Sequence, residues 1–291
     1  MKSLVIGMGI GQLYKTVLEK LGYEVVTVDA DSTKGADYTD IRKAINGQWF
    51  DTAHICTPNY THLSIAETIA PYARIVFIEK PGVKTSEEWS NLVRLRPYTK
   101  FMMVKNNMWR DNIKEITNSA SVAKCVEIDW MRKNCVPSPG SWFTTRSLAF
   151  GGVSRDLMPH LLSLYIAINP NWRSENISST STLQNWTLET VDSTEYGQIN
   201  PTGTYDVDDS CKINFGTKWH CRADWRTLKE DRSAITVIHQ DNTKEIFELG
   251  WCPEQAYLNM IKDAVDNVNN SNFWKQQLEQ DLWIHSKIEN L

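Results

Sequence analysis

The stretch SLVIGMGIGQLY, residues 3–14, decides the fold. A short apolar run leads directly into Gly7, Gly9 and Gly11, and a segment with apolar residues at helical spacing follows. A buried strand, a glycine-rich turn and the start of a helix in this order are typical of a βα unit that binds phosphate groups at the helix N-terminus. The fingerprint G-x-G-x-x-G would place its third glycine at Gln12, whereas here a glycine stands one residue earlier. We therefore predict a phosphate-binding turn with a shortened loop.

A second β-branched run, EVVTVD, ends at Asp29, about twenty residues after the glycines. An acidic side chain at that place accepts hydrogen bonds from the adenosine ribose of a dinucleotide and repels a 2′-phosphate, so the pattern favours NAD over NADP. A glycine-rich βα turn without a ligand is the structural alternative. The residues predicted to bind the cofactor in this part of the chain are Gly7, Met8, Gly9, Ile10, Gly11 and Asp29.

The first hundred residues alternate between short β-branched runs and segments with helical spacing of apolar residues. This rhythm predicts an α/β fold with a doubly wound parallel sheet of the Rossmann type over residues 1–110. Residues 111–291 differ, with one strongly apolar helix, several strands of alternating polarity and two closing helices. They predict an α+β domain with an open, largely antiparallel sheet, whose last helix can pack back on the first domain.

Two further motifs stand at the carboxyl ends of predicted strands, CTPNYTH at residues 56–62 and FIEKPG at residues 77–82. The carboxyl ends of parallel strands line the cofactor crevice of such a sheet. A Glu–Lys pair at such a strand end favours a role in the crevice. The structural alternative for this hexapeptide by itself is a solvated charge pair before a Pro-Gly turn. The residues predicted here to lie near the cofactor are Thr57, Pro58, Asn59, His62, Glu79 and Lys80.

The stretch GGVSRDLMPHLLSLY, residues 151–165, carries an acid and a base four positions apart. From its apolar spacing we predict one helix that begins near Asp156 and continues through His160, so that both side chains share one face. Pro159 is tolerated if the helix has only just begun, because the first turn has unpaired N–H groups. An Asp/His pair that faces a crevice is a candidate for general acid–base chemistry, whereas a lone histidine there is more often structural.

Together, GMGIG, CTPNYTH, EKPG and GGVSRDLMPH, with Asp29 after the second strand, resemble the glucose–fructose oxidoreductase, inositol dehydrogenase and rhizopine-catabolism (Gfo/Idh/MocA) family of NAD(P)-dependent oxidoreductases. The resemblance covers the chain as far as the last of these motifs and extends to the remainder in architecture only. It implies a nicotinamide cofactor in the first domain and a second domain that binds a small substrate. It also implies a homo-oligomer with contacts through the C-terminal sheet.

Carried over by motif, the resemblance makes Lys80, Asp156 and His160 the catalytic group. It implies hydride transfer between the nicotinamide and the CH–OH or C=O carbon of a sugar, a cyclitol or a nucleotide-linked sugar. His160 can take the hydroxyl proton near neutral pH, while Asp156 can orient the substrate or the imidazole. Lys80 can stabilise the developing alkoxide as a cation, or act as the base as a desolvated amine. The residues leave open whether Lys80 or His160 accepts the proton.

Five further side chains are candidate substrate contacts, with loop packing or solvation as the alternative. They lie after the fifth strand or in the segment that leads to the Asp/His pair: Asn107, Arg110, Trp142, Arg146 and Arg155.

Composition narrows the class of protein. The 291 residues carry a formal net charge of −4, which disfavours a nucleic acid or an anionic membrane as partner. We expect a cytoplasmic protein, because there is no signal-peptide pattern and no apolar run that could cross a bilayer. The six cysteines form no C-x-x-C pair and no group has zinc-site spacing, so we expect reduced thiols and no metal.

Two other functions are compatible with the sequence. An imine or enone reductase of the biliverdin-reductase type shares the fold and needs no base for an alcohol. A cofactor-binding regulator would keep the fold without turnover, although it would have no need to keep Lys80, Asp156 and His160 together.

Overall fold

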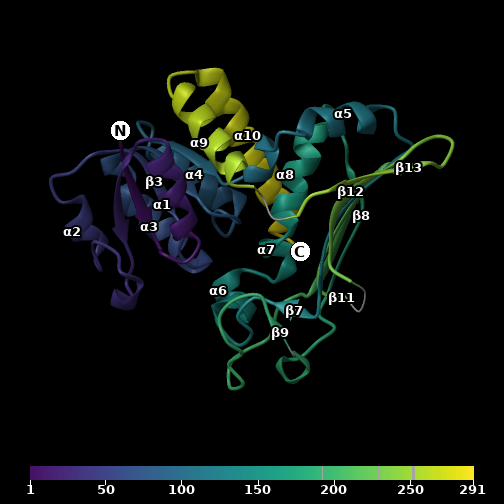
Figure 1. Ribbon diagram of the computed structural model, residues 1–291, viewed down its shortest axis with the longest axis horizontal. Helices are drawn as coiled ribbons and strands as arrows, with labels where there is room; N and C mark the ends of the chain where they lie inside the picture. Colours follow the sequence, from purple (N-terminus) through teal and green to yellow (C-terminus); the bar gives the residue numbers. More distant parts are fainter. Residues whose placement is uncertain (192, 228–229, 251–252) are drawn as a thin grey trace. The chain divides into compact units, whose positions relative to one another are not determined.

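The structure is a computed structural model that describes residues 1–191, 193–227, 230–250 and 253–291. The chain forms two compact units, which are labelled by element in Figure 1. Unit 1 comprises Met1–Asn106 and Pro253–Glu289, and unit 2 comprises Asn107–Cys252 and Asn290–Leu291. Each unit has its own sheet and its own buried core.

Unit 1 is built on a five-stranded parallel sheet with the strand order β2-β1-β3-β4-β5. Its strands are β1 (Lys2–Ile6), β2 (Glu24–Val28), β3 (Phe50–Ile55), β4 (Ala73–Ile78) and β5 (Lys100–Met103). The register pairs Ile6 with Val28 and Ile55, and it pairs Ile78 with Ile55 and Met103. The carboxyl ends of the strands therefore stop at one edge, and the loops with the predicted cofactor residues leave from that edge. The predicted parallel sheet is confirmed.

The helices of unit 1 pack on this sheet or on one another. They are α1 (Gly11–Lys20), α2 (Ile41–Ile45), α3 (His62–Ile69), α4 (Ser86–Leu95), α9 (Glu254–Asp266) and α10 (Ser271–Ile288), with short 3-10 helices η1 (Ser32–Lys34), η2 (Asn59–Thr61) and η3 (Ala70–Tyr72). α1 contacts β1, β2 and β3, and α3 contacts β3 and β4. The strand order reverses between β1 and β3, so the loops after these two strands leave from the switch point where such sheets bind ligands.

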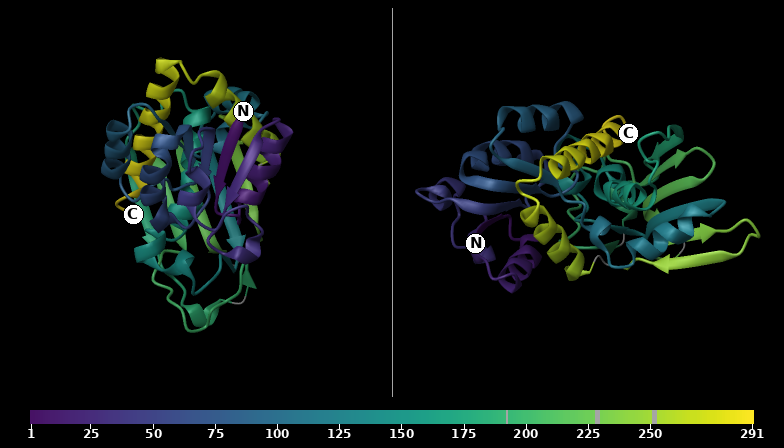
Figure 2. Two further views of the ribbon diagram at one scale, coloured as in Figure 1. Left: turned by 90° about the vertical axis from the view of Figure 1, so that its left-hand side faces the viewer. Right: turned by 90° about the horizontal axis from the view of Figure 1, so that it is seen from above.

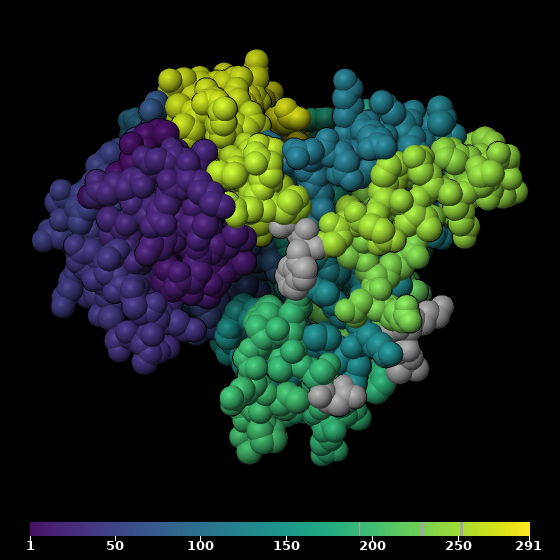
Figure 3. All heavy atoms as spheres, viewed as in Figure 1, coloured from purple at the N-terminus to yellow at the C-terminus, as the bar shows by residue number. Residues whose placement is uncertain are grey.

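The two closing helices belong to unit 1, although they follow all the strands of unit 2 in the chain. α9 packs against α1, where Lys20 and Glu254 form an exposed ion pair with an N–O distance of 2.5 Å. In Figure 3 the atoms of α9 and α10 (yellow) lie directly against the N-terminal part of the chain (purple). The sequence predicted the division 1–110 and 111–291, with a last helix that can pack back on the first domain. The observed unit 1 includes both closing helices, α9 and α10.

A buried ion pair attaches α10 to the edge strand of the parallel sheet. The ammonium of Lys105, just after β5, pairs with a carboxylate oxygen of Asp281, and both side chains are fully buried. The other carboxylate oxygen of Asp281 accepts a hydrogen bond from the backbone N–H of Met103 at 3.1 Å. Burial raises the pKa of Asp281 to about 6, and the neighbouring ammonium acts in the opposite direction. α10 is thus held by charge as well as by apolar packing.

Unit 2 is built on a six-stranded sheet with the strand order β13-β12-β6-β11-β10-β8. Its strands are β6 (Cys125–Lys133), β8 (Ile177–Leu183), β10 (Ser210–Phe215), β11 (Trp219–Thr227), β12 (Arg232–Ile238) and β13 (Lys244–Glu248), and β7 (Cys135–Val136) and β9 (Ser193–Thr194) form a separate pair. β6 and β11 are parallel to each other, whereas the other neighbouring strands are antiparallel. The open, largely antiparallel sheet predicted for this part of the chain is confirmed.

The core of unit 2 lies between this sheet and one helix, α8 (Met158–Ile168), which the right-hand view of Figure 2 shows beside the sheet. Nine of its 11 residues are buried, and it contacts β6 and β11. Near its middle the ring of Tyr165 stacks on Phe215 of β10, with ring centroids 4.3 Å apart. The remaining helical segments of unit 2 are α5 (Ile113–Ser121), η5 (Trp142–Thr144), α6 (Arg146–Ala149), α7 (Val153–Asp156) and η6 (Leu188–Thr190), and η4 (Asn106–Trp109) begins it.

Among the described residues, no helix has both the length and the apolar character needed to cross a membrane.

Candidate functional site

The glycine turn after β1 explains how the shortened fingerprint works. Gly7 has φ +92°, and a Cβ there would lie 2.6 Å from the carbonyl oxygen of Cys56, so only glycine fits. A Cβ at Gly11 would approach a methyl carbon of Val5 at 3.0 Å, whereas a Cβ at Gly9 would meet no described atom within 4 Å. A tight turn, open space for the phosphate and close helix–strand packing are the three roles of the fingerprint glycines. Gly11 therefore takes the place of the third glycine.

The start of α1 supplies an anion cradle. Ile10 is its N-cap and provides no capping side chain, and the N–H groups of Gln12 and Leu13 donate to the carbonyl oxygens of Gly9 and Ile10 at 3.3 and 3.0 Å. The positive end of the helix is therefore not covered by a side chain. The carboxylate of Asp29 lies beside this turn and accepts hydrogen bonds from the backbone N–H groups of Met8 at 2.6 Å and Asp31 at 2.9 Å. The glycines, the uncapped helix start and the acid after β2 together fit a dinucleotide.

His62 ties together the loops that follow β3 and β4. Its Nδ1 lies 2.7 Å from the carbonyl oxygen of Gly82, and its Nε2 lies 2.7 Å from that of Thr57. Burial lowers the pKa of this imidazole, although its two backbone partners act in the opposite direction. Next to it, Pro58 and Asn59 form the start of η2. The observed contacts show that His62 holds the two loops together. Direct contact of Thr57, Pro58, Asn59 and His62 with a cofactor stays a prediction.

Glu79 and Lys80 follow β4, as predicted. Glu79 is 8% exposed and accepts a hydrogen bond from the hydroxyl of Tyr14 on α1 at 2.6 Å. Burial and the Glu79 carboxylate raise the pKa of Tyr14 well above its usual value, so the phenol stays a donor. The backbone N–H of Lys80 donates to the same carboxylate at 3.1 Å. Glu79 therefore fixes the backbone that carries Lys80, whose side chain is half-buried.

In unit 2 the structure brings Asp156 and His160 to the junction of two helices. α7 ends at Asp156, and α8 begins at Met158. The carboxylate of Asp156 is 8% exposed and accepts a hydrogen bond from Trp225 Nε1 at 3.1 Å. The ring of His160 stacks on Trp130, with centroids 5.4 Å apart and an angle of 28°. Because Trp130 is on β6 and Trp225 is on β11, the pair lies over the carboxyl ends of the two parallel strands of this sheet.

Asn107 and Arg110, predicted as substrate contacts, are buried beside this pair. Asn107 Nδ2 lies 3.1 Å from His160 Nδ1, and Asn107 Oδ1 accepts a hydrogen bond from Arg110 Nε at 2.7 Å. Arg110 is 8% exposed, and its Nη1 donates to the carbonyl oxygen of Leu249 at 2.6 Å. Asn107 and Arg110 both make these contacts within unit 2. Their contact with a substrate stays a prediction.

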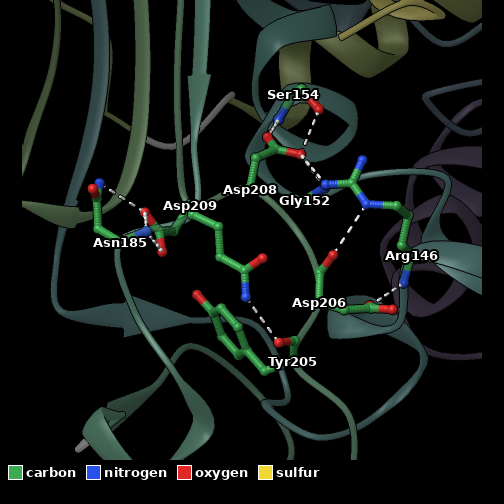
Figure 4. Close-up of polar contacts among 9 residues, drawn as sticks. Arg146, Gly152, Ser154, Asn185, Tyr205, Asp206, Asp208 and Asp209 are labelled. Carbon is green, nitrogen blue, oxygen red and sulfur yellow. Dashed lines mark hydrogen bonds and ion pairs between the residues drawn. The ribbon is translucent and has the colours of Figure 1, made fainter.

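Asp208 holds the turn from which α7 begins (Figure 4). Its carboxylate accepts hydrogen bonds from the N–H of Gly152 at 2.9 Å, the N–H of Ser154 at 2.8 Å and the hydroxyl of Ser154 at 3.0 Å. The chain at Gly152 runs so close to Asp208 that a Cβ there would lie 1.8 Å from the carbonyl oxygen of Asp208. The glycine pair before α7 thus allows a close approach, and Asp208 caps the helix that carries Asp156.

The other predicted substrate contacts lie near this turn. The backbone N–H of Arg146 donates to Asp206 Oδ1 at 2.6 Å, and its guanidinium Nε donates to the Asp206 carbonyl oxygen at 3.0 Å (Figure 4). Arg155 is 4% exposed, on α7. Trp142 stacks on Phe143, with centroids 3.8 Å apart. Contact of Trp142, Arg146 or Arg155 with a substrate is not tested by these observations.

Sequence patterns did not predict four side chains that shape these sites, namely Tyr14, Trp130, Asp208 and Trp225. Each acts on a residue at least 30 positions away in the chain. The sequence contains a signal for Trp130. Val126, Ile128 and Trp130 are spaced two residues apart on one strand, so Trp130 faces the core with the other two. For Asp208 the signal is the pair of glycines before α7, which indicates that another backbone passes close by.

Comparison with known proteins agrees with this geometry. Residues 4–104 match the family described as "Oxidoreductase family, NAD-binding Rossmann fold" (GFO_IDH_MocA). A curated relative, named "Putative UDP-kanosamine synthase oxidoreductase subunit", from Amycolatopsis mediterranei (strain S699), is 27% identical over 197 residues. The alignment covers 62% of this chain, and the chain spans 55% of the length of that relative.

Solved structures show the same fold over nearly the whole chain. GenD2 from gentamicin A biosynthesis, in complex with NAD, superposes with a TM-score of 0.77 at 17% identity and covers 99% of this chain and 92% of its own. A myo-inositol dehydrogenase from Corynebacterium glutamicum has a TM-score of 0.74 at 12% identity, with 100% of this chain and 94% of its own covered. The match at residues 4–104, the glycine cradle and the two-sheet architecture agree with the resemblance found in the motifs. Residues 4–104 therefore match the NAD-binding Rossmann domain of the Gfo/Idh/MocA oxidoreductase family.

Proposed function

We propose that this protein transfers a hydride between NAD and the CH–OH or C=O carbon of a sugar, a cyclitol or a nucleotide-linked sugar. The observation that carries the proposal is the Asp156/His160 pair at the junction of α7 and α8. Trp225 holds the carboxylate there and Trp130 holds the imidazole, so both groups are preorganised. A protein that only bound a cofactor would have no use for a buried acid and a half-buried base, both held in orientation, in its second unit.

The reaction needs one site for the hydride and one for the proton. When bound, NAD supplies the nicotinamide carbon that accepts the hydride from the alcohol carbon. The hydroxyl proton then passes to a base of the protein, Lys80 or His160, and Asp156 orients the substrate or the imidazole. In the reverse direction the same base returns the proton to the carbonyl oxygen. The balance of atoms is complete with one alcohol, one oxidised cofactor and one base.

The position of Asp29 supports NAD over NADP. Its carboxylate lies at the glycine turn, where a 2′-phosphate would meet a second negative charge. The names of the relatives support the substrate class. A UDP-kanosamine synthase subunit and a myo-inositol dehydrogenase are both named for hydroxylated ring compounds. We therefore propose a polyhydroxylated ring as the substrate.

The test is a panel of sugars, cyclitols and nucleotide-linked sugars, incubated with NAD⁺ or NADP⁺ and followed by the absorbance of the reduced cofactor. We expect turnover of at least one alcohol, and we expect Lys80→Met and His160→Ala each to reduce it roughly a hundredfold or more. Saturable NADH binding without turnover of any alcohol, but with reduction of an imine or enone, would assign the biliverdin-reductase type of reaction instead. Binding of NADH without turnover of any of these compounds would assign the role of a cofactor-binding regulator instead.

Self-association through the sheet of unit 2 is part of the same proposal. It rests on the family resemblance and on the architecture of unit 2, in which one face of the sheet packs on α8. Sedimentation velocity of the purified chain over a range of concentrations tests it. A monomer at all concentrations would contradict it.

A further inference from the structure

The histidine of the Asp/His pair is the end of a continuous hydrogen-bonded chain of three side chains. Arg110 Nε donates to Asn107 Oδ1 at 2.7 Å, and Asn107 Nδ2 lies 3.1 Å from His160 Nδ1. Asn107 is fully buried and Arg110 is 8% exposed, so the hydrogen bond between these two side chains is shielded from water, while His160 is half-buried. All three residues belong to unit 2.

The chemistry of these groups fixes the direction of each hydrogen bond. A guanidinium can only donate, so the Asn107 atom that faces Arg110 must be the amide oxygen. The amide nitrogen therefore faces His160, and an amide nitrogen also only donates. His160 Nδ1 must then accept with its lone pair, and a ring nitrogen that accepts carries no hydrogen. In the neutral imidazole the hydrogen is consequently on Nε2.

The surroundings keep both Asn107 and the imidazole in this orientation. The Arg110 guanidinium is itself anchored, because Nη1 donates to the carbonyl oxygen of Leu249 at 2.6 Å. On the other side the ring of His160 is stacked on Trp130, at 5.4 Å between centroids. A hydrogen on Nδ1 would point at the N–H of Asn107, so two donors would face each other in a buried place. A flip of the Asn107 amide would point its nitrogen at the guanidinium of Arg110, with the same conflict.

We propose that Asn107, oriented by Arg110, is a positioning residue that holds His160 as a neutral imidazole with its hydrogen on Nε2. In this tautomer His160 offers the substrate oxygen a hydrogen-bond donor, and its Nε2 has no lone pair for a proton. The consequence for catalysis rests on the proposed function. The hydroxyl proton of the alcohol goes to the amine of Lys80, while its hydride goes to NAD and His160 keeps its own hydrogen throughout. In the direction of reduction, the ammonium of Lys80 returns the proton to the carbonyl oxygen.

This assignment decides between Lys80 and His160 as the proton acceptor, which the sequence leaves open. If His160 were the proton acceptor, it would need its lone pair on Nε2 and its hydrogen on Nδ1, directed at a hydrogen-bond acceptor. A carboxylate in the place of Asn107 would provide that acceptor, but an amide oriented by arginine does not. A neutral histidine that donates a hydrogen bond to a substrate oxygen stabilises the negative charge that develops there.

The experiment measures the tautomer directly. Protein with ¹⁵N-labelled imidazole rings is studied at about pH 8, where an ordinary imidazole is neutral, by long-range ¹H–¹⁵N correlation without cofactor or substrate. The His160 signal is assigned by its loss in His160→Gln. We expect a protonated Nε2 and an unprotonated Nδ1 in the wild-type protein. A His160 spectrum with hydrogen on Nδ1, or on both nitrogens, would overturn the proposal without the need for any variant at position 107.

Asn107→Asp is the matching variant. It has nearly the same shape, and one carboxylate oxygen can still accept from Arg110, while the other replaces the amide donor opposite His160. We expect the hydrogen of His160 to move to Nδ1. Asn112→Asp, which makes the same chemical change at the N-cap of α5, serves as the control and should leave the His160 signals unchanged. An unchanged His160 in folded Asn107→Asp would also overturn the proposal.

The outcomes for this inference and for the proposed function are distinguishable. The tautomer is measured on the protein alone, so a substrate panel without turnover would remove the proposed function and leave the spectrum valid. With a substrate in hand, Asn107→Asp should lower kcat by roughly tenfold or more, because the donor that stabilises the substrate oxygen is lost. An unchanged kcat together with an inverted tautomer would show that His160 is not a donor in the reaction.

Discussion

The third fingerprint glycine shows how far a single residue can be predicted. The sequence shows that a glycine stands one position early, and the structure shows that Gly11 still makes the close contact with β1 that its role requires. The hydrogen bond from the N–H of Met8 to Asp29 could not be predicted in the same way. It depends on the path of the loop after the strands have paired, which a residue pattern does not describe. The glycines and the acid after the second strand were therefore predictable as parts of one site, and the hydrogen bond from Met8 to Asp29 was not.

Asp29→Asn tests the acid at the glycine turn. The amide keeps an oxygen that can accept from the backbone but loses the negative charge that favours ribose hydroxyls and repels a 2′-phosphate. We expect the Kd for NADH to rise by about tenfold, the size of one charge-assisted hydrogen bond, and the Kd for NADPH to rise less or to fall. Fluorescence titration with both cofactors measures the ratio. Asp31→Asn, an exposed acid two positions further on, is the control, and an unchanged NADH/NADPH ratio in Asp29→Asn would remove Asp29 from the site.

At the scale of elements, the helix that carries the Asp/His pair differs from its prediction. The apolar spacing predicts one helix from Arg155 through Ile168, whereas the structure has α7 and α8 with a break at Leu157. The reason is Pro159, which has no N–H and whose ring would clash with the carbonyl of Arg155 in a continuous helix. Periodicity identified the helical segment and its buried face. It could not show that the proline would divide the segment between the two polar residues.

The cap of α7 leads to a prediction about Asp208. Asp208→Ala leaves the buried N–H groups of Gly152 and Ser154 without their acceptor, which costs about 1–3 kcal/mol for an unsatisfied group. We expect the free energy of unfolding, measured by urea titration, to fall by about that amount. Asp206→Ala is the control, because its carboxylate is exposed and water can replace it at the N–H of Arg146. Equal losses in the two variants would contradict the role of Asp208 as a buried cap.

The two ion pairs that attach the closing helices to unit 1 should differ strongly in their effect on stability. Asp281→Ala leaves the ammonium of Lys105 buried without its partner, and loss of one member of such a pair costs about 3–5 kcal/mol. Glu254→Ala breaks the exposed pair with Lys20 and should cost no more than about 1 kcal/mol. Urea unfolding gives both values, and hydrogen exchange should show faster opening of α10 in Asp281→Ala alone. Similar small losses in both variants would mean that apolar packing alone holds α10.

For the whole molecule, the sequence predicts the kind of each sheet but not the assignment of every element to a unit. Continuous β-branched runs indicated the buried strands of a parallel sheet, and alternating runs indicated an open, largely antiparallel sheet, and both were confirmed. The closing helices are different. An amphipathic face such as that of α9 shows that something must cover it, but the sequence does not say which surface does so. Only the folded chain shows that Glu254 and Asp281 find their partners in the first 106 residues.

The stability of the whole protein should depend on pH through a histidine in the parallel sheet. His54 on β3 is 1% exposed, its ring stacks on Phe77 at 4.8 Å, and burial lowers its pKa to about 3. In the unfolded chain the same imidazole has a pKa of about 6.5, so the unfolded state binds a proton that the folded state rejects. The contribution of His54 to the free energy of unfolding is therefore complete above about pH 6.5. Below that pH it falls by about 1.4 kcal/mol per pH unit as the pH decreases toward 3.

His54→Phe should reduce this acid sensitivity, because the ring on Phe77 is kept and the titrating group is lost. We compare the free energies of unfolding of the wild-type protein and the variant in urea between pH 8 and pH 4. The two curves should run parallel above about pH 7 and converge, or cross, as the pH falls, since only the wild-type protein loses the contribution of His54. Because overpacking by the larger ring shifts the whole curve of the variant equally at every pH, the difference in slope is the quantity that decides. Parallel curves down to pH 4 would mean that the folded protein takes up a proton at His54 as readily as the unfolded chain does, and that the sheet around β3 is open to water.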